Sequence, residues 1–452
     1  MTVRAIARKG MVLAAAALLA AGCAARVGPE DRREERRLAE SRSVEQQTAV
    51  KRTADSLLAE KETAEPGTAG GIVERRTDRH AADGHAADLR AAERGRTDPP
   101  SDVPPGAPSG APSASPRVPA PDIPDGVRGI YVSGWIAGSK ERMERLIRLV
   151  DETDLNAMVI DVKNDYGKLT YRSSLPEVRA VGADREPAVR DMAGLLRRLK
   201  AKRIYTIGRI VVFKDPLLAR AKPEWAFHTK SGKLWRDRKG TPWVEPYLPE
   251  VRAYNIAIAK EAAALGFDEI QFDYVRFPDN GSEMDRVVRY RNPAGGTKRE
   301  AIGRFLRDAR EALHEAGAAV SADVFGLVTT ARDDMGIGQT WREIASAVDV
   351  ISPMVYPSHY ARGTYGIRHP DLQPAAVVRH ALDDAVRRNR VLAAEGKHPA
   401  RIRPWLQAFT ASWLSPHQVY RAEEIHEQIR AAGEAGVRQF LLWDPACTYD
   451  YR

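Results

Sequence analysis

The stretch GFDEIQFDYVRFP, residues 266–278, has the alternating pattern of a β-strand that ends at a Phe-Pro pair. Its side chains divide into a bulky set and a polar set of opposite parity, namely Ile270, Phe272 and Tyr274 against Glu269, Gln271 and Asp273. Successive residues of a strand face opposite sides, and parallel α/β proteins do their chemistry at the carboxyl ends of their strands. Asp273 is therefore a candidate catalytic carboxylate, and a helix-capping or salt-bridged Asp is the structural alternative.

Seven further strand-like runs accompany this one, at 129–135, 157–163, 204–213, 319–326, 348–356, 403–409 and 439–445. Amphipathic helical segments lie between the runs, for example at 140–153, 189–202, 252–266, 299–317 and 422–436. Eight repeats of strand and helix predict a closed (β/α)8 TIM barrel. An open doubly wound sheet is the alternative, but such a sheet normally carries a Gly-rich phosphate turn after its first strand, and this sequence has none there.

The N-terminus has the layout of an export signal. Three basic residues precede the apolar run MVLAAAALLAAG, which ends at Cys23 and is short for a membrane span. The stretch LAAGC, residues 19–23, is similar to a bacterial lipobox, in which the Cys is lipidated, although Ala20 stands where Leu is more usual. We therefore expect residues 1–23 to be a lipoprotein signal peptide. A plain secreted protein with an incidental Cys is the alternative.

Residues 24–126 have the composition of a disordered linker. Residues 24–98 are rich in Ala, Arg and Glu, and residues 99–125 hold ten Pro, which predicts a semi-rigid spacer. The globular part, residues 127–452, contains all eight Trp and carries 51 Lys and Arg against 42 Asp and Glu. This mild positive charge suits an anionic envelope polymer as a ligand. A dense basic stripe interleaved with aromatic residues is missing from the sequence, so we do not expect nucleic acid as a partner.

Polar side chains gather at inward-facing positions near the predicted strand ends. Charges that point into a barrel are costly unless they pair or line an open site. Asp273 and Asp323 stand at matching heights on neighbouring strands, and we expect them to be the catalytic residues. The expected substrate-binding residues are Trp135, Asp161, Lys163, Arg209, Gln271, Arg276, Tyr356, His359, Gln407, Trp443 and Asp444. The alternative is a purely structural ion-pair cluster, made of Lys163, Arg209, Asp161 and Asp273.

Two carboxylates on neighbouring strands suit the cleavage of a glycosidic bond. Lys163 and Arg209 would hold Asp273 ionised, as a nucleophile or a base requires. Asp323 lies in the apolar context ADVFG and would more readily keep the proton of a general acid.

Aromatic residues and His are frequent in the loops after the third and sixth strands, at Trp225, His228, Trp235 and Trp243, and at His359, Tyr360, Tyr365 and His369. Aromatic faces at the mouth of a barrel can stack on sugar rings. The His residues do not have metal-ligand spacing, so we expect neither a catalytic metal nor a cofactor.

Residues from about 127 to 445 resemble a bacterial family of glycoside hydrolases that is distantly similar to α-amylase-like (β/α)8 barrels. The resemblance is carried by RGIYVSGW (128–135), NAMVIDVKNDYGKLTY (156–171), GFDEIQFDYVRFP (266–278), SADVFG (321–326) and ISPMVYPSHY (351–360). It implies a polysaccharide-acting barrel with Asp273 in the position of the nucleophile on the fourth strand. Two departures from the amylase-like pattern are Asp323 in place of a Glu acid and Gln271 in place of an Arg.

These features predict a glycoside hydrolase that acts on an envelope or extracellular polysaccharide. The lipidated Cys23 would anchor the protein to a membrane outside the cytoplasm, in the periplasm or at the cell surface. In a cell with two membranes, Ala24 after the Cys favours the outer one. A non-catalytic glycan-binding barrel is the main alternative, and a deacetylase would need metal ligands that the sequence does not offer.

Overall fold

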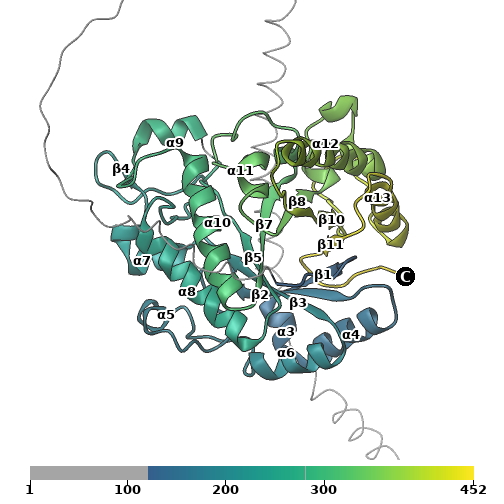
Figure 1. The fold of residues 1–452 in the computed structure, drawn as a ribbon, viewed down its shortest axis with the longest axis horizontal. Coiled ribbons are helices and arrows are strands. Elements are labelled where there is room, and N and C mark those ends of the chain that lie inside the picture. Colours follow the sequence, from purple (N-terminus) through teal and green to yellow (C-terminus); the bar gives the residue numbers. More distant parts are fainter. Residues whose placement is uncertain (1–120, 280) are drawn as a thin grey trace, which may run out of the picture. The chain divides into compact units, whose positions relative to one another are not determined.

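Residues 121–279 and 281–452 are described by a computed structural model, and they form a closed barrel of eight parallel strands (Figure 1). The strand order is β10-β11-β1-β2-β3-β5-β7-β8, and the pairing of β10 with β8 closes the ring. The strands are β1 (Arg128–Val132), β2 (Ala157–Lys163), β3 (Tyr205–Val211), β5 (Glu269–Asp273), β7 (Ala319–Phe325), β8 (Val350–Val355), β10 (Trp405–Gln407) and β11 (Phe440–Trp443), and the short β9 (Arg401–Ile402) precedes β10 and pairs with β8. The predicted (β/α)8 TIM barrel is confirmed.

Helices connect the strands and surround them, as Figure 1 shows. The longer ones are α4 (Lys140–Asp151), α6 (Met192–Ala201), α8 (Pro249–Leu265), α10 (Lys298–Glu315), α12 (Pro374–Ala394) and α13 (Ala422–Glu434). Shorter helices begin several of the connections, namely α3 (Gly134–Gly138), α5 (Pro176–Val181), α7 (Pro216–Ala221), α9 (Gly281–Val287) and α11 (Trp341–Ala345).

The helix boundaries follow local sequence signals. Thr297 and Glu300 form a reciprocal capping box at the start of α10, which satisfies two backbone N–H groups that would otherwise lack partners. Pro249 starts α8, and Gly266 ends it in the left-handed conformation at φ 118°, a conformation that costs glycine little because it has no Cβ.

The strand parity predicted for residues 269–273 is confirmed. Phe272 points outward, and its ring lies 5.0 Å from that of Phe305 in α10. Gln271 points inward, and its Nε2 donates to Ser352 Oγ of β8 at 3.2 Å. Alternate residues of β5 therefore pack against a helix or fill the barrel interior, which directs Asp273 inward as well.

The amino-terminal end of the barrel is closed by a buried ion pair. Arg403 Nη1 lies 2.9 Å from Glu269 Oε1, and both side chains are fully buried. The Tyr205 hydroxyl donates to the same carboxylate at 3.2 Å. This ion pair lies at the starts of the strands and has a structural role. The charged side chains at the carboxyl end of the barrel form a separate group.

An insertion at the mouth is built from the segments that follow β3 and β5. In it, β4 (His228–Thr229) pairs antiparallel with β6 (Val288–Arg289). The carboxylate of Glu245 is fully buried and accepts from the Arg291 backbone N–H and, at 3.3 Å, from Arg291 Nε. This ion pair holds the two segments together.

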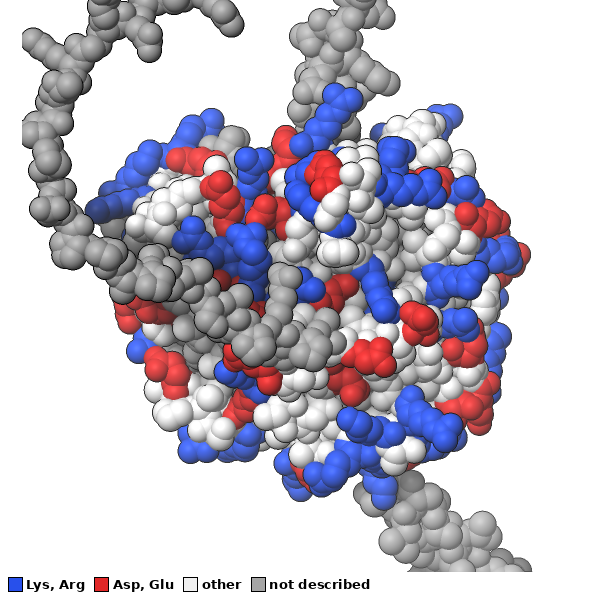
Figure 2. Space-filling model, viewed as in Figure 1, with Lys and Arg blue, Asp and Glu red and all other residues white. Residues whose placement is uncertain are grey.

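Acidic and basic side chains are interspersed on the described part of the face that Figure 2 shows. Within residues 121–279 and 281–452, no helix has both the length and the apolar character needed to cross a membrane. The expected signal peptide with Cys23, and nearly all of the expected linker, lie outside the described residues.

Candidate active site

Arg209 of β3 lies among three carboxylates at the carboxyl end of the barrel. Its Nε and Nη2 lie 2.9 and 2.7 Å from Asp273 Oδ2. Its Nη1 donates to Asp161 Oδ1 at 2.5 Å, and Nη2 also reaches Asp165 Oδ1 at 3.1 Å. The guanidinium is 1% exposed, so water screens these interactions little. Of the two cations expected to hold Asp273, Arg209 does contact it.

Aromatic rings flank this guanidinium. Tyr131 of β1 donates its hydroxyl proton to Asp161 Oδ2 at 2.6 Å, and its ring stacks on Trp443 of β11 at 4.1 Å. The Arg209 Cζ lies 5.8 Å from the centre of the Tyr131 ring and 5.7 Å from that of Trp443. A cation over an aromatic face is stabilised by the ring quadrupole, and the rings fix the plane of the guanidinium beside Asp273.

The backbone turns sharply directly after Asp273. Tyr274 has φ 50°, and its N–H donates to Asp273 Oδ1 at 2.6 Å. A bulky residue in the left-handed region costs on the order of 1–3 kcal/mol and persists only when its surroundings enforce it. The turn ends β5 at the mouth and gives Asp273 a third hydrogen-bond donor, so both carboxylate oxygens have fixed positions.

Asp323 of β7 is the second inward carboxylate. The register pairs Gln271 with Ser321 and Phe272 with Ala322. Continued by one residue, it places Asp273 opposite Asp323 on the adjacent strand. Asp323 Oδ1 accepts a hydrogen bond from Trp405 Nε1 of β10 at 2.7 Å. Both carboxylates are nearly inaccessible, at 3% and 2% exposure. Two buried carboxyl groups thus stand at the same height on neighbouring strands.

Acidic and basic side chains are concentrated around Arg209. Asp161, Asp165 and Asp273 each form an ion pair with Arg209, and Lys214 lies near Asp165. The Lys214 Nζ lies 3.9 Å from Asp165 Oδ2 and donates to the Tyr274 hydroxyl at 3.3 Å. Three carboxyl groups and two basic side chains therefore lie together at the carboxyl end of the barrel.

The expectation that Lys163 holds Asp273 ionised is wrong. Its Nζ donates to Asp215 Oδ2 at 2.8 Å and to Asn255 Oδ1 at 2.7 Å, on the helix side of the strands. The pairing of β2 with β3 shifts register between Asp161 and Lys163, so Lys163 pairs with Ile210 instead of following the inward parity of Asp161. A β-bulge of this kind turns the next side chain to the other face.

Two further expected substrate-binding residues make contacts within the protein. The Arg276 guanidinium is 2% exposed and lies between the rings of Trp243, Tyr274 and Phe325, 4.6 to 5.1 Å from their centres. Asp444 accepts from the backbone N–H groups of Ala446 and Thr448 and from the Thr448 hydroxyl. Burial raises the pKa of Asp444.

The remaining expected residues lie near the strand ends. Gln407 of β10 is fully buried, and its Oε1 accepts from the backbone N–H and hydroxyl of Ser358. His359 contacts the Tyr356 ring, with 5.3 Å between ring centres, and burial lowers the pKa of His359 to about 3. Trp135, in α3, has 53% of its surface exposed.

Four of the eight loop residues expected at the mouth are buried, and Trp225, His228, Tyr365 and His369 are partly exposed. Trp235 and Trp243 of the loop after β3 are 6% and 1% exposed, and Tyr360 after β8 is 7% exposed. Trp135 and Trp413 are the exposed tryptophans among the described large apolar residues.

Asp165, Lys214 and Tyr131 belong to the site but were not selected from the sequence. Asp165 lies in the loop directly after β2, and Lys214 follows β3. Both positions come after a predicted strand end, a signal that could have identified them. Tyr131 has the parity of an inward-facing residue of β1, but a Tyr in a strand is more often part of the core.

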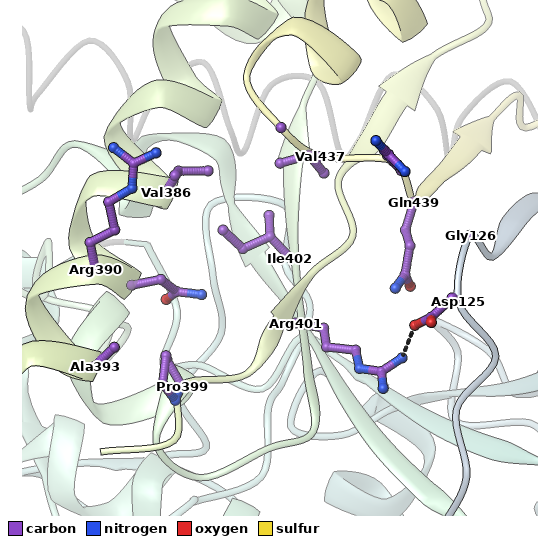
Figure 3. A pocket seen from close by; sticks show the side chains of 13 residues that line it. Asp125, Gly126, Val386, Arg390, Ala393, Pro399, Arg401, Ile402, Val437 and Gln439 are labelled. Atoms are coloured by element: carbon purple, nitrogen blue, oxygen red, sulfur yellow. Dashed lines mark hydrogen bonds and ion pairs between the residues drawn. The ribbon is translucent and has the colours of Figure 1, made fainter. Parts of the chain in front are cut away.

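Among the residues that the structure describes, no group of three or more His, Cys, Asp or Glu is arranged to hold a metal ion. A separate cavity of about 570 Å³ lies at the opposite, amino-terminal end of the barrel (Figure 3). Arg401 and Asp125, which line it, form an ion pair of 3.2 Å between Nη1 and Oδ1. It is lined by residues of α12 and β9 and by residues directly before β1 and β11, and Asp273 is not among them.

The fold of this chain is similar to that of a solved glycoside hydrolase domain. The glycoside hydrolase domain of PgaB (BpsB) from Bordetella bronchiseptica is 15% identical, with a TM-score of 0.50, over 72% of this chain and 94% of that one. An α-galactosidase from Thermus thermophilus is 14% identical, with a TM-score of 0.42, over 73% and 60% of the two chains.

A hypothetical protein from Ruminiclostridium thermocellum is 38% identical, with a TM-score of 0.40, over 46% of this chain and 98% of that one. Among curated proteins, none matches this chain significantly. Residues 129–449, almost the whole barrel, match the model of one sequence family. The chain belongs to that family, which is described as "Putative glycosyl hydrolase domain".

Proposed function

We propose that this barrel hydrolyses glycosidic bonds of an envelope or extracellular polysaccharide, with Asp273 as nucleophile or base and Asp323 as general acid. The observation that carries the proposal is the arrangement of Asp273. Three N–H donors from Arg209 and Tyr274 bind its two oxygens at the mouth of the barrel. Donors of this kind stabilise the ionised carboxylate, which is the form that attacks a sugar or activates water.

The three carboxyl groups held by Arg209 support the same chemistry. Glycoside hydrolysis passes through a transition state in which the sugar ring resembles an oxocarbenium ion. Asp161, Asp165 and Asp273 are fixed by hydrogen bonds before the substrate arrives, so they need no reorganisation to stabilise that positive charge.

In the proposed reaction, Asp323 gives its proton to the oxygen of the leaving sugar as the glycosidic bond breaks. Its Oδ1 accepts the hydrogen bond from Trp405 Nε1, which holds the carboxyl group in position. Trp405 therefore orients the acid. The guanidinium that the amylase-like pattern carries two residues before the nucleophile would be supplied here by Arg209 of the neighbouring strand.

The Asp323 contact also favours one alternative, a non-catalytic glycan-binding barrel. An N–H donor stabilises the ionised form of a carboxylate, and an Asp323 that stayed ionised could not protonate a leaving group. In that case the mouth would bind a glycan without cleaving it.

Two variants separate these functions. Asp273→Asn should abolish product formation from every substrate, because the nucleophile or base is lost. Asp323→Asn should abolish cleavage of a polysaccharide but retain activity on a dinitrophenyl glycoside of the same sugar, whose leaving group needs no proton. Glycan retention by the wild type without any product would instead support the binding barrel.

Membrane anchoring through Cys23 is a separate proposal, which rests on the sequence 19–23. Cys23→Ser should move the protein from the membrane fraction to the soluble fraction. Continued membrane association of that variant would refute the anchor.

A further inference from the structure

A group of aromatic side chains lies at the mouth on the strands beyond Asp323. Phe409 and Trp413 stack with 6.1 Å between ring centres and an interplanar angle of 23°. His359 stands nearly perpendicular to both, at 87°, with its ring 6.0 Å from Phe409 and 6.4 Å from Trp413. We call Phe409, Trp413 and His359 the aromatic platform.

Buried polar groups fix the platform from below. The Ser358 hydroxyl shares a hydrogen bond of 2.8 Å with His359 Nδ1 and donates to Gln407 Oε1, also at 2.8 Å. Gln407 Nε2 donates to the Phe409 carbonyl at 3.0 Å. These bonds join the ends of β8 and β10, so the rings have fixed positions.

The platform has an exposed face. Trp413 is 38% exposed, whereas His359 beneath it is 4% exposed. Two aliphatic side chains nearby, Leu372 and Val419, are 36% and 48% exposed. Leu372 and Val419 come directly after two residues that join their segments, since the Gln418 N–H donates to Asp371 Oδ2 at 2.7 Å. A rigid, flat apolar face at the mouth is costly to leave in water and suits a flat apolar partner.

The position of the aromatic platform relative to Asp323 indicates which ligand would stack on it. β8 and β10, which carry the platform, are the next strands beyond β7, and Trp405 of β10 contacts Asp323 directly. A sugar ring has an apolar face that stacks on aromatic rings while its hydroxyls stay in water. A chain of sugars that crosses the mouth at Asp323 would reach the platform with its next units.

We propose that Trp413, supported by Phe409 and His359, is a stacking subsite for a sugar unit of the polysaccharide on the Asp323 side of the bond that is cleaved. This inference rests on the proposed function and narrows its substrate to a chain of several sugars. It assigns Trp413 to binding the chain and gives it no part in bond cleavage.

The test measures retention by polysaccharide in affinity electrophoresis, in the full-length Asp273→Asn protein, which binds without turnover. Bacterial envelope and extracellular polysaccharides serve as probes. Adding Trp413→Leu, which keeps the apolar bulk but removes the flat ring, should weaken retention by about tenfold, equivalent to about 1.4 kcal/mol. Trp413→Phe should restore most of the retention. Val391→Ala, another exposed apolar residue (50%) on α12, is the matched control and should change nothing.

The outcomes separate the two proposals. Equal retention of the Trp413→Leu and Trp413 proteins would overturn the subsite and leave the proposed function intact. Retention of neither protein by any polysaccharide, together with no product from the wild type, would overturn both. Trp413 is partly exposed, so its variants should keep the thermal unfolding midpoint of the parent protein, and a variant that loses retention only because it unfolds is recognised by that midpoint.

Discussion

Replacing Arg209 by Met should destabilise the protein strongly, because it removes the cation that three buried carboxylates share. The guanidinium makes four hydrogen bonds, two of them to Asp273, one to Asp161 and one to Asp165. Met fills a similar volume, so the change removes charge more than packing. Lys214 Nζ lies 3.9 Å from Asp165 Oδ2 and would stay near that acid in the variant.

The expected size follows from the burial of the partners. Removing one member of a buried, hydrogen-bonded ion pair costs about 3–5 kcal/mol, because the other member is left uncompensated. Since two of the four bonds go to Asp273, the double variant Arg209→Met, Asp273→Asn should recover about 2 kcal/mol of that loss.

Urea unfolding of the wild type, both single variants and the double variant gives this coupling energy. Arg379→Met serves as the matched control, because its ion pair with Asp383 is exposed, at 42% and 46%, and its loss should be hardly measurable. Two results would refute the reasoning, namely a cost below about 1 kcal/mol for Arg209→Met or strictly additive single-variant effects.

Three further predictions concern groups near the site. Lys163→Met should destabilise the protein by about 3–5 kcal/mol, since it leaves Asp215 buried without its cation, but activity per folded molecule should not change; a selective loss of activity would return Lys163 to the site. Burial raises the pKa of Glu245 from 4.5 to about 7, so between these pH values the folded state holds a proton that the unfolded state has released. The stability of the wild type should therefore fall as pH rises from 4.5 to 7, and Glu245→Gln should remove this pH dependence. Parallel pH profiles of unfolding for the two proteins would contradict this. Burial lowers the pKa of His359 from 6.5 to about 3, so the unfolded state takes up a proton first and stability should decline as pH falls from about 6.5 to 3; a His359→Gln protein with the same acid decline as the wild type would count against it.

The fold was predictable because strand and helix periods are local properties of the sequence. The eight strand-like runs each correspond to a strand of the barrel, and the alternation at 269–273 correctly separated Phe272, which packs on α10, from the inward Gln271. Closure of the ring followed from the count of repeats.

The site residues could be predicted only where inward and outward side chains alternate regularly along a strand. Asp161 and Arg209 were placed correctly as neighbours of Asp273, because their strands are regular up to those residues. Lys163 was misplaced because a bulge, which leaves no clear mark in the sequence, reverses its direction. Asp165 was missed because it lies in a loop, where alternation gives no information about direction.

Aromatic residues were the least predictable. Trp243 and Trp413 look alike in sequence, both in polar loops after strands, but one is 1% exposed and the other 38%. Trp243 packs against Tyr274 and Arg276, which follow β5, and long-range packing of this kind cannot be read from a local pattern.

The central claim is that Asp273, fixed by Arg209 and Tyr274, carries out the cleavage of a glycosidic bond. The most direct test is kcat for release of new reducing ends from a polysaccharide, measured for the wild type and Asp273→Asn under identical conditions. The account predicts a loss on the order of 10³-fold or more, with the variant still folded by urea unfolding and still bound to the glycan. A folded Asp273→Asn protein that cleaves at the wild-type rate would contradict it.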